Sequence, residues 1–163
     1  MKHPGHLKNN TIVMLFTLCF FVSSGVSFAN GNSPETGAQT RKAQKVDAKR
    51  SAQKALTALR NAYVLKNQDA FFQSASEEPY FSQTDLKVRL SSDFTRYDVL
   101  DLNFTVDHEL TEGDKVVLKT HWQKRQVRRD TGNVELKEGR SDFVFRVEEA
   151  QAHLLDIQKD NPF

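Results

Sequence analysis

The hydrophobic period of this chain changes once, near Tyr97, and this change constrains the fold more than any other feature. Between Arg41 and Tyr97 apolar residues recur at helical spacing, whereas after Tyr97 they alternate with polar residues. Side chains three and four positions apart share a helix face, and alternate side chains share a strand face. The order predicts an α+β domain in which N-terminal helices pack on one face of a curved antiparallel four-stranded sheet.

Three helices are expected before the change. Residues 41–66 contain neither Gly nor Pro and predict a long amphipathic helix. Its basic outer face is either a solvated surface or a docking surface for an anionic membrane or acidic partner. A short second helix includes Phe71 and ends before Pro79, and a third carries Leu86 and Leu90 on its buried stripe.

Four strands are expected after the change. The first carries alternating apolar residues from Leu100 to Leu110, and the others cover 115–129, 134–148 and 152–158. Polar turns at 112–114 and 130–133 separate the first three strands. Gly139, inside the third, predicts a bulge or bend.

The first 29 residues predict a cleavable export signal. Lys2 and Lys8 form a charged start, the run 12–21 is apolar, and small residues stand at Ser27 and Ala29. The apolar run is shorter than the roughly 20 residues of a membrane span, so no stable span is expected. We predict cleavage after Ala29 and a periplasmic or secreted protein, with a flexible leader at 30–40 and one domain at 41–163.

Removal of the signal also limits the chemistry of the mature domain. Cys19 is the single cysteine of the chain, so the domain would have no disulfide and no cysteine ligand for a metal. The signal contains two lysines and no acid, so its loss cancels the formal net charge of +2. A balanced charge argues against nucleic acid as a partner.

Two stretches of the sheet region carry a family resemblance, 139–146 (GRSDFVFR) and 154–163 (LLDIQKDNPF). With the helix-then-strand order, they resemble the nuclear transport factor 2-like superfamily (SnoaL-like, cystatin-like cone fold) over residues 41–163. The sequence departs from the family pattern at 148–151, which lacks the usual turn glycine, and at Ala152, where members often have Trp. The resemblance implies a pocket between the helices and the concave sheet face. Members use it for isomerisation, dehydration, cyclisation or binding, or dimerise through the sheet.

Six side chains are candidates for the wall of such a pocket, because they are aromatic or follow the apolar face of a strand. They are Tyr80, Phe104, His108, Trp122, Phe143 and Phe145. The same aromatic side chains can instead close the core of a domain of this size.

Catalysis has weaker candidates. Asp98 and Asp156 are the strand acids in phase with apolar neighbours, and His108 is the histidine in that position. His121 and His153 are out of phase, so we expect no metal site, and no sequence motif indicates a cofactor. The basic group that includes Lys124 and Arg125 indicates solubility control at a strand, or alternatively a site for an anion or acidic partner.

The sequence therefore favours an exported, non-catalytic domain that binds a small apolar ligand or a protein partner. A homodimer through the sheet is a further expectation. The competing hypothesis is a small isomerase, dehydratase or cyclase that uses the same cavity.

Overall fold

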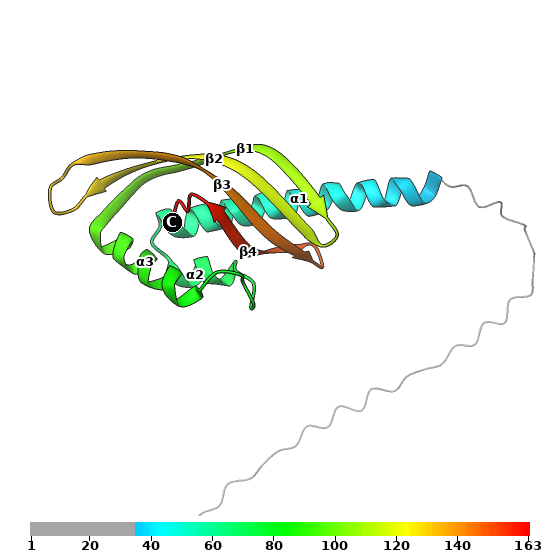
Figure 1. Ribbon diagram of the computed structural model, residues 1–163, viewed down its shortest axis with the longest axis horizontal. Coiled ribbons are helices and arrows are strands. Elements are labelled where there is room, and N and C mark those ends of the chain that lie inside the picture. The colour runs from blue at the N-terminus through cyan, green and yellow to red at the C-terminus, as the bar shows by residue number, and fades with distance from the viewer. Residues whose placement is uncertain (1–34) are drawn as a thin grey trace, which may run out of the picture. The chain divides into compact units, whose positions relative to one another are not determined.

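A computed structural model describes residues 35–163, in which three helices precede four strands (Figure 1). The helices and strands are α1 (Glu35–Val64), α2 (Gln68–Gln73), α3 (Gln83–Arg96), β1 (Tyr97–Glu112), β2 (Lys115–Arg128), β3 (Val134–Glu148) and β4 (Gln151–Lys159). The predicted α+β order is confirmed. The predicted export signal lies outside the described residues, and α1 begins inside the segment 30–40 that was expected to be a flexible leader.

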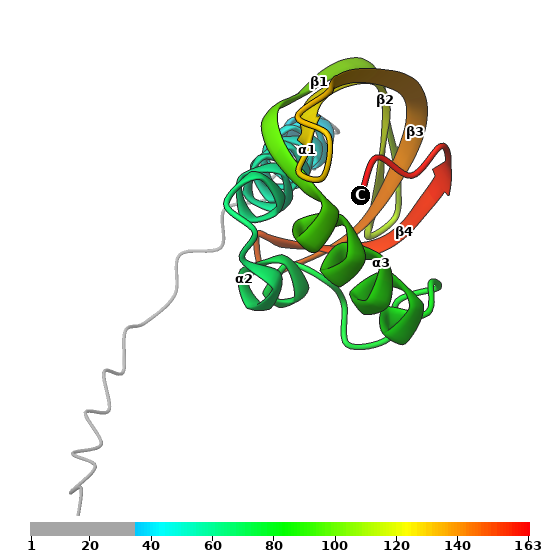
Figure 2. The ribbon, with the colours of Figure 1, turned by 90° about the vertical axis from the view of Figure 1, so that its left-hand side faces the viewer.

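The four strands form one antiparallel sheet in the order β1-β2-β3-β4, so each strand pairs with its neighbours in the chain. The sheet curves strongly, and α1 lies along its concave side (Figures 1 and 2). α1 contacts all four strands, whereas α3 contacts β1 and leads directly into it. This arrangement of helices and curved sheet is the predicted cone.

The ends of the two shorter helices are fixed by polar side chains. The Asn67 side chain accepts a hydrogen bond from the Ala70 backbone N–H at the start of α2, at 3.0 Å. The Ser82 hydroxyl accepts from the Asp85 backbone N–H at the start of α3, at 3.2 Å. Such caps satisfy backbone donors that have no partner within the helix.

The core lies between α1 and the concave face of the sheet. Leu59 and Tyr63 of α1 are fully buried, as are Leu118, Phe143 and Phe145 of the sheet. Burial of a large apolar side chain contributes about 1.5–3 kcal/mol, so this cluster is a principal source of stability. Phe143 and Phe145, two of the predicted candidates for the pocket wall, thus belong to this core.

Bulges change the phase of β1, which the alternating pattern did not predict. A register shift between Val106 and His108 turns the following residues over. Glu109 consequently contacts Lys49 and Gln53 of α1, whereas Leu110 is 45% exposed. The prediction that Leu110 continues the apolar face is wrong for this reason.

Gly139 does not form the predicted bulge. It pairs with Trp122 in an uninterrupted register between β2 and β3. A Cβ atom at this position would lie 2.6 Å from Cζ2 of Trp122, closer than such atoms approach one another. The glycine therefore makes room for the indole ring on the concave face.

The chain turns back beneath the concave face after β4, and we call residues 160–163 the 160–163 segment (Figure 2). It has no regular secondary structure, yet Phe163 is only 2% exposed. The Phe163 ring packs edge-on against Phe71, with ring centroids 4.8 Å apart, and also contacts Tyr63 at 5.2 Å. The segment thus fills the space that an empty cone would leave open.

Candidate functional site

Four of the six predicted wall residues lie on the concave face. Phe143 and Phe145 are fully buried, and Phe104 is partly buried with its ring 5.3 Å from that of Phe143. Trp122 is 6% exposed and is the cross-strand neighbour of Phe104. The three phenylalanines belong to the packed core, and Trp122 lies farther along the face, beside polar residues.

The other two lie elsewhere. Tyr80 is 63% exposed, in the segment after α2, where its hydroxyl accepts a hydrogen bond from Lys115. His108 is exposed because it follows the bulge in β1, and it borders a polar groove of about 440 Å³ with Lys119 and Asp142. Neither side chain lines the cone.

The two acids expected to face a cavity point away from it. Asp98 is exposed and pairs with Lys66 and Arg129, each nitrogen 2.7 Å from its Oδ1. Hydrogen bonds from Arg129 and then Lys66 lower the pKa of Asp98 to about 2, so it is ionised at neutral pH. In β4 a register shift makes Asp156 the neighbour of Val144 on the outer face. Neither position suits a general base that acts inside the cone.

A cluster of polar side chains that the sequence interpretation missed lies inside the cone, around Lys124. Lys124 is 4% exposed, and its Nζ donates to the Tyr63 hydroxyl at 3.0 Å and to the carbonyl oxygen of Pro162 at 2.8 Å. The Tyr63 hydroxyl in turn donates to Asp93 at 3.0 Å, and Lys124 Nζ lies 3.8 Å from the same carboxylate oxygen. Helix α1, helix α3, strand β2 and the 160–163 segment therefore meet at one ammonium group.

Burial perturbs both titratable groups at the centre of this cluster. Loss of solvent lowers the pKa of Lys124 from 10.5 to about 8, and the nearby Asp93 carboxylate opposes that shift. Loss of solvent, reinforced by Asp93, raises the pKa of Tyr63 well above its ordinary 10.0. At neutral pH Lys124 is mainly protonated and Tyr63 is a neutral hydrogen-bond donor.

Two polar atoms on either side of Lys124 have no partner within the described part of the chain. These buried atoms are Nε1 of Trp122, a donor, and Oε1 of Gln126, an acceptor. Gln126 is fully buried, and its amide nitrogen donates to Glu135 at 3.0 Å. Leaving a buried polar atom unsatisfied costs roughly 1–3 kcal/mol, so each of these two atoms is a position where a water molecule or a polar group of a ligand would be stabilised.

The alternation of side chains along β2 is the sequence feature that could have identified this cluster. Val116 and Leu118 face the core, and every second residue after them, through Trp122, Lys124 and Gln126, faces the same way. The interpretation of Lys124 as part of a solvated basic strand end is therefore wrong. Arg125 does point outward and is exposed, as that interpretation expected.

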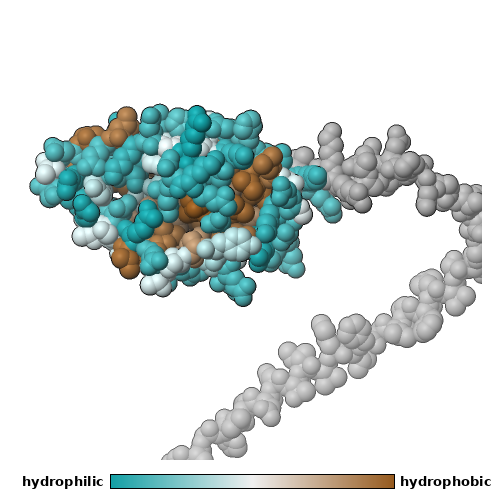
Figure 3. Space-filling model, viewed as in Figure 1, coloured by the Kyte–Doolittle hydropathy of each residue, from teal (hydrophilic) through white to brown (hydrophobic). Residues whose placement is uncertain are grey.

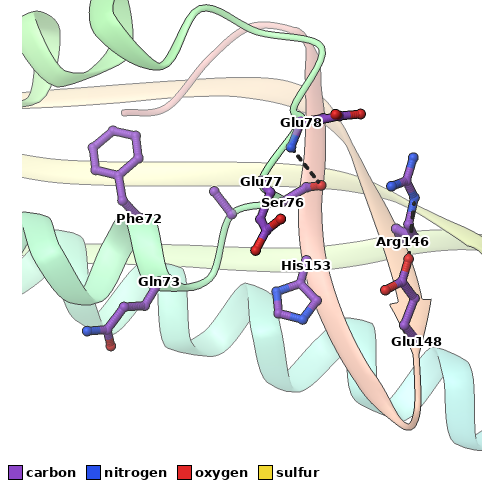
Figure 4. Close-up of a pocket in the computed structure, with 9 residues that line it drawn as sticks. Phe72, Gln73, Ser76, Glu77, Glu78, Arg146, Glu148 and His153 are labelled. Carbon is purple, nitrogen blue, oxygen red and sulfur yellow. Dashed lines mark hydrogen bonds and ion pairs between the residues drawn. The ribbon is translucent and has the colours of Figure 1, made fainter.

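A second, open groove lies where the chain between α2 and α3 crosses the end of the sheet (Figure 4). It holds about 450 Å³ and is bordered by Glu77, Glu78, Arg146, Glu148 and His153. Arg146 contacts Glu148, and Ser76 accepts a hydrogen bond from the Glu78 backbone. Among the described residues, no group of three or more His, Cys, Asp or Glu side chains is placed to bind a metal ion.

The outer surface is mainly hydrophilic, with separate hydrophobic patches on the face that Figure 3 shows. Val134 and Leu136, at the start of β3, are 63% and 71% exposed. Glu135 between them faces Gln126, so these two side chains project from the outer face of the sheet. No helix in the described residues is long and apolar enough to cross a membrane.

Comparisons with known proteins agree on the fold. No family model matches the chain, and no curated protein matches it. A conserved protein from Planctomyces limnophilus superposes with a TM-score of 0.62 at 11% identity, covering 68% of this chain and 93% of that chain. A nuclear transport factor 2-like superfamily protein from Salmonella enterica gives 0.59 at 13%, covering 73% and 94%. A ketosteroid isomerase-like protein from Erwinia carotovora gives 0.56 at 14%, covering 66% and 90%.

These similarities define a cone-shaped α+β domain. More particularly, the chain has the nuclear transport factor 2-like fold, as the sequence resemblance implied. Identities this low establish the architecture and leave the chemistry to the residues of the site.

Proposed function

We propose that this chain is an exported, non-catalytic domain that binds a small molecule on the concave face of its sheet. The observation that carries this proposal is the buried polar group around Lys124, where Trp122 Nε1 and Gln126 Oε1 lack partners within the described residues. A domain that used its cone only as a core would gain stability by replacing these side chains with apolar ones.

The absence of an inward carboxylate at the expected positions supports binding over catalysis in the described part of the chain. Asp98 is held on the surface by two cations, and Asp156 accepts from the backbone N–H of Ile157 on the outer side.

Native mass spectrometry of the exported protein, purified without unfolding from the organism that encodes it, tests this proposal. We expect a retained ligand that disappears on denaturation and is absent from the Lys124→Met variant. Lys119→Met is the matched control, because Lys119 lies on the same strand but faces outward. A wild-type protein that is ligand-free, and stays so when incubated with an extract of small molecules from its host, would contradict the proposal.

A small isomerase-like enzyme is the second candidate, favoured by one specific observation. The Tyr63 hydroxyl lies between Asp93 and Lys124, so a hydrogen-bonded carboxylate and a tyrosine stand side by side within the cone. Conversion of the retained ligand by wild-type protein, and no conversion by the Asp93→Asn variant, would establish catalysis. Unchanged ligand after prolonged incubation would support binding alone.

We also propose that the outer face of the sheet joins two copies of this chain. Val134 and Leu136 support this, because exposed apolar side chains on a strand favour association. Sedimentation velocity of wild type and Leu136→Lys tests the dimer. A dimer that dissociates in the variant is expected, and a wild-type monomer at high micromolar concentration would contradict it.

A further inference from the structure

The 160–163 segment occupies the concave site in the way that a ligand would. The Phe163 ring lies among four aromatic rings, 4.8 Å from Phe71, 5.2 Å from Tyr63, 6.0 Å from Phe143 and 6.1 Å from Phe104 between centroids. Edge-on and tilted contacts at these distances are the favourable geometry for aromatic rings. The cage is therefore shaped for one planar ring.

Two cations face the oxygens next to that ring. Lys124 Nζ donates to the carbonyl oxygen of Pro162 at 2.8 Å, and the Arg89 guanidinium donates to a main-chain oxygen of Phe163 at 3.3 Å. The Pro162 carbonyl is a neutral peptide group, and such a group makes weaker hydrogen bonds to a cation than a carboxylate does. The ring cage and the cations together match an aromatic molecule that carries an acid group.

The buried indole nitrogen of Trp122, which has no partner among the described residues, also favours a ligand with an acid group. Trp122, Lys124 and Gln126 follow one another on the concave face of β2, and all three are more than nine-tenths buried. Nε1 of Trp122 has no acceptor within the described residues. A carboxylate on Lys124 has a second oxygen that can accept from this indole, which the Pro162 carbonyl does not provide.

The attachment of the segment is compatible with its displacement. Lys159, the last residue of β4, has φ +68°, a left-handed conformation that is unfavourable for a residue other than glycine. Beyond it, Asp160 is held by backbone and side-chain contacts to Arg140 and Ser141 at the sheet. The residues that enter the cone are thus hinged at the edge of the sheet.

We propose that the 160–163 segment is a displaceable plug, and that the site beneath it binds a small aromatic carboxylate. The ligand ring takes the place of the Phe163 ring, and its carboxylate binds Lys124 and the Trp122 indole. This assignment rests on the proposed function, since it names the class of molecule that the concave site receives.

The test uses 3-phenylpropionate as the probe and 3-phenylpropan-1-ol as its uncharged counterpart. Trp122 is the single tryptophan of the chain, so its fluorescence reports binding directly, and calorimetry gives the affinity. Phe163→Ala removes the competing ring. Because apparent affinity falls with the fraction of protein that is open, we expect this variant to bind 3-phenylpropionate at least about tenfold more tightly than wild type.

The charge requirement separates this site from a simple cavity. Phe163→Ala is expected to prefer the acid over the alcohol by about tenfold or more, the range of a charge-assisted hydrogen bond. Adding Lys124→Met should remove that preference, whereas adding Lys119→Met should keep it. Equal binding of acid and alcohol by Phe163→Ala would overturn the proposal, as would no binding by a variant whose circular dichroism is that of the wild type.

A wild-type experiment keeps the proposal testable if Phe163→Ala does not fold. The Phe163 backbone N–H donates to the Asn161 side chain within the part of the segment that enters the cone, so its hydrogen exchange reports whether the plug is in place. Saturating 3-phenylpropionate should accelerate exchange in residues 160–163 and slow it around Lys124. Unchanged exchange at millimolar probe would overturn the plug. A retained natural ligand without an acid group would overturn the ligand class while leaving the proposed function intact.

Discussion

Replacing Lys124 with methionine should change the pH dependence of stability in a direction that burial alone dictates. The folded protein lowers the pKa of Lys124 to about 8, whereas in the unfolded chain this amine titrates near 10.5. Between these values the unfolded state binds more protons than the folded state. Stability therefore rises with pH through this window, and the unfavourable contribution of the buried ammonium is fully present below pH 8.

The size of the change in the free energy of unfolding follows from the lowered pKa of Lys124. Each unit of pKa difference corresponds to about 1.4 kcal/mol, so a lowering from 10.5 to about 8 destabilises the protein at neutral pH by about 3 kcal/mol. Between pH 7 and 9.5 about 2 kcal/mol of this is relieved. Tyr63 does not interfere, because its pKa is raised above 10.0 and the measurement stops below that value.

Urea unfolding of wild type and Lys124→Met at pH 7, 8, 9 and 9.5 measures this contribution. Wild type should gain about 2 kcal/mol relative to the variant across the series, and Lys119→Met should run parallel to wild type. Parallel curves for wild type and Lys124→Met would refute the reasoning, because they would mean that the amine is solvated when folded. A relative loss of wild-type stability would mean that Asp93 outweighs desolvation.

Three further predictions concern other parts of the chain. Gly139→Ala should destabilise the protein by about 1–3 kcal/mol and shift Trp122 fluorescence, because the new methyl group would lie 2.6 Å from the indole; an unchanged unfolding midpoint would contradict this packing. Asp98→Asn should flatten the loss of stability between pH 4 and pH 2, since the pKa of Asp98 is held near 2 only in the folded state; an identical acid limb in urea unfolding would contradict the two ion pairs. The protein purified from the organism that encodes it should have the intact mass of a chain that begins at Asn30, and a mass that includes residues 1–29 would contradict the predicted cleavage after Ala29.

The fold could be predicted from the sequence because its determinants are local. Leu86 and Leu90 at helical spacing, and Val116 and Leu118 at strand spacing, specify which side of each element is buried. The position of the change in period then fixes the helix-before-sheet order. These features require no knowledge of which strands pair.

The orientation of single candidates could not be predicted where the sheet is irregular. A bulge places an extra residue in one strand, and every later side chain then faces the opposite side. In β4 the extra residue is Leu155. As a result Ile157 faces the core and Asp156 faces out. In β1 a bulge has the same effect at His108. Such bulges arise from pairing with a neighbouring strand, which the pattern of one strand does not encode.

Lys124 was missed for a different reason, because its phase was visible and its charge was given more weight. A lysine in phase with Leu118 and Trp122 is buried if the strand continues regularly, and β2 has no register shift against β3. The neighbouring Arg125, Arg128 and Arg129 made the stretch resemble a solvated strand end. Strand phase was the better guide here.

The buried lysine also explains why a filled cone is not evidence for a purely structural one. Core residues such as Phe143 are satisfied by contact alone, whereas Lys124 is satisfied by groups from α1, α3 and the 160–163 segment. Only the segment is free of regular secondary structure. If it leaves, the Lys124 ammonium loses the Pro162 carbonyl, and a carboxylate is the group that replaces it best. The same residue that weakens the fold at neutral pH thus gives the site its preference for an acid.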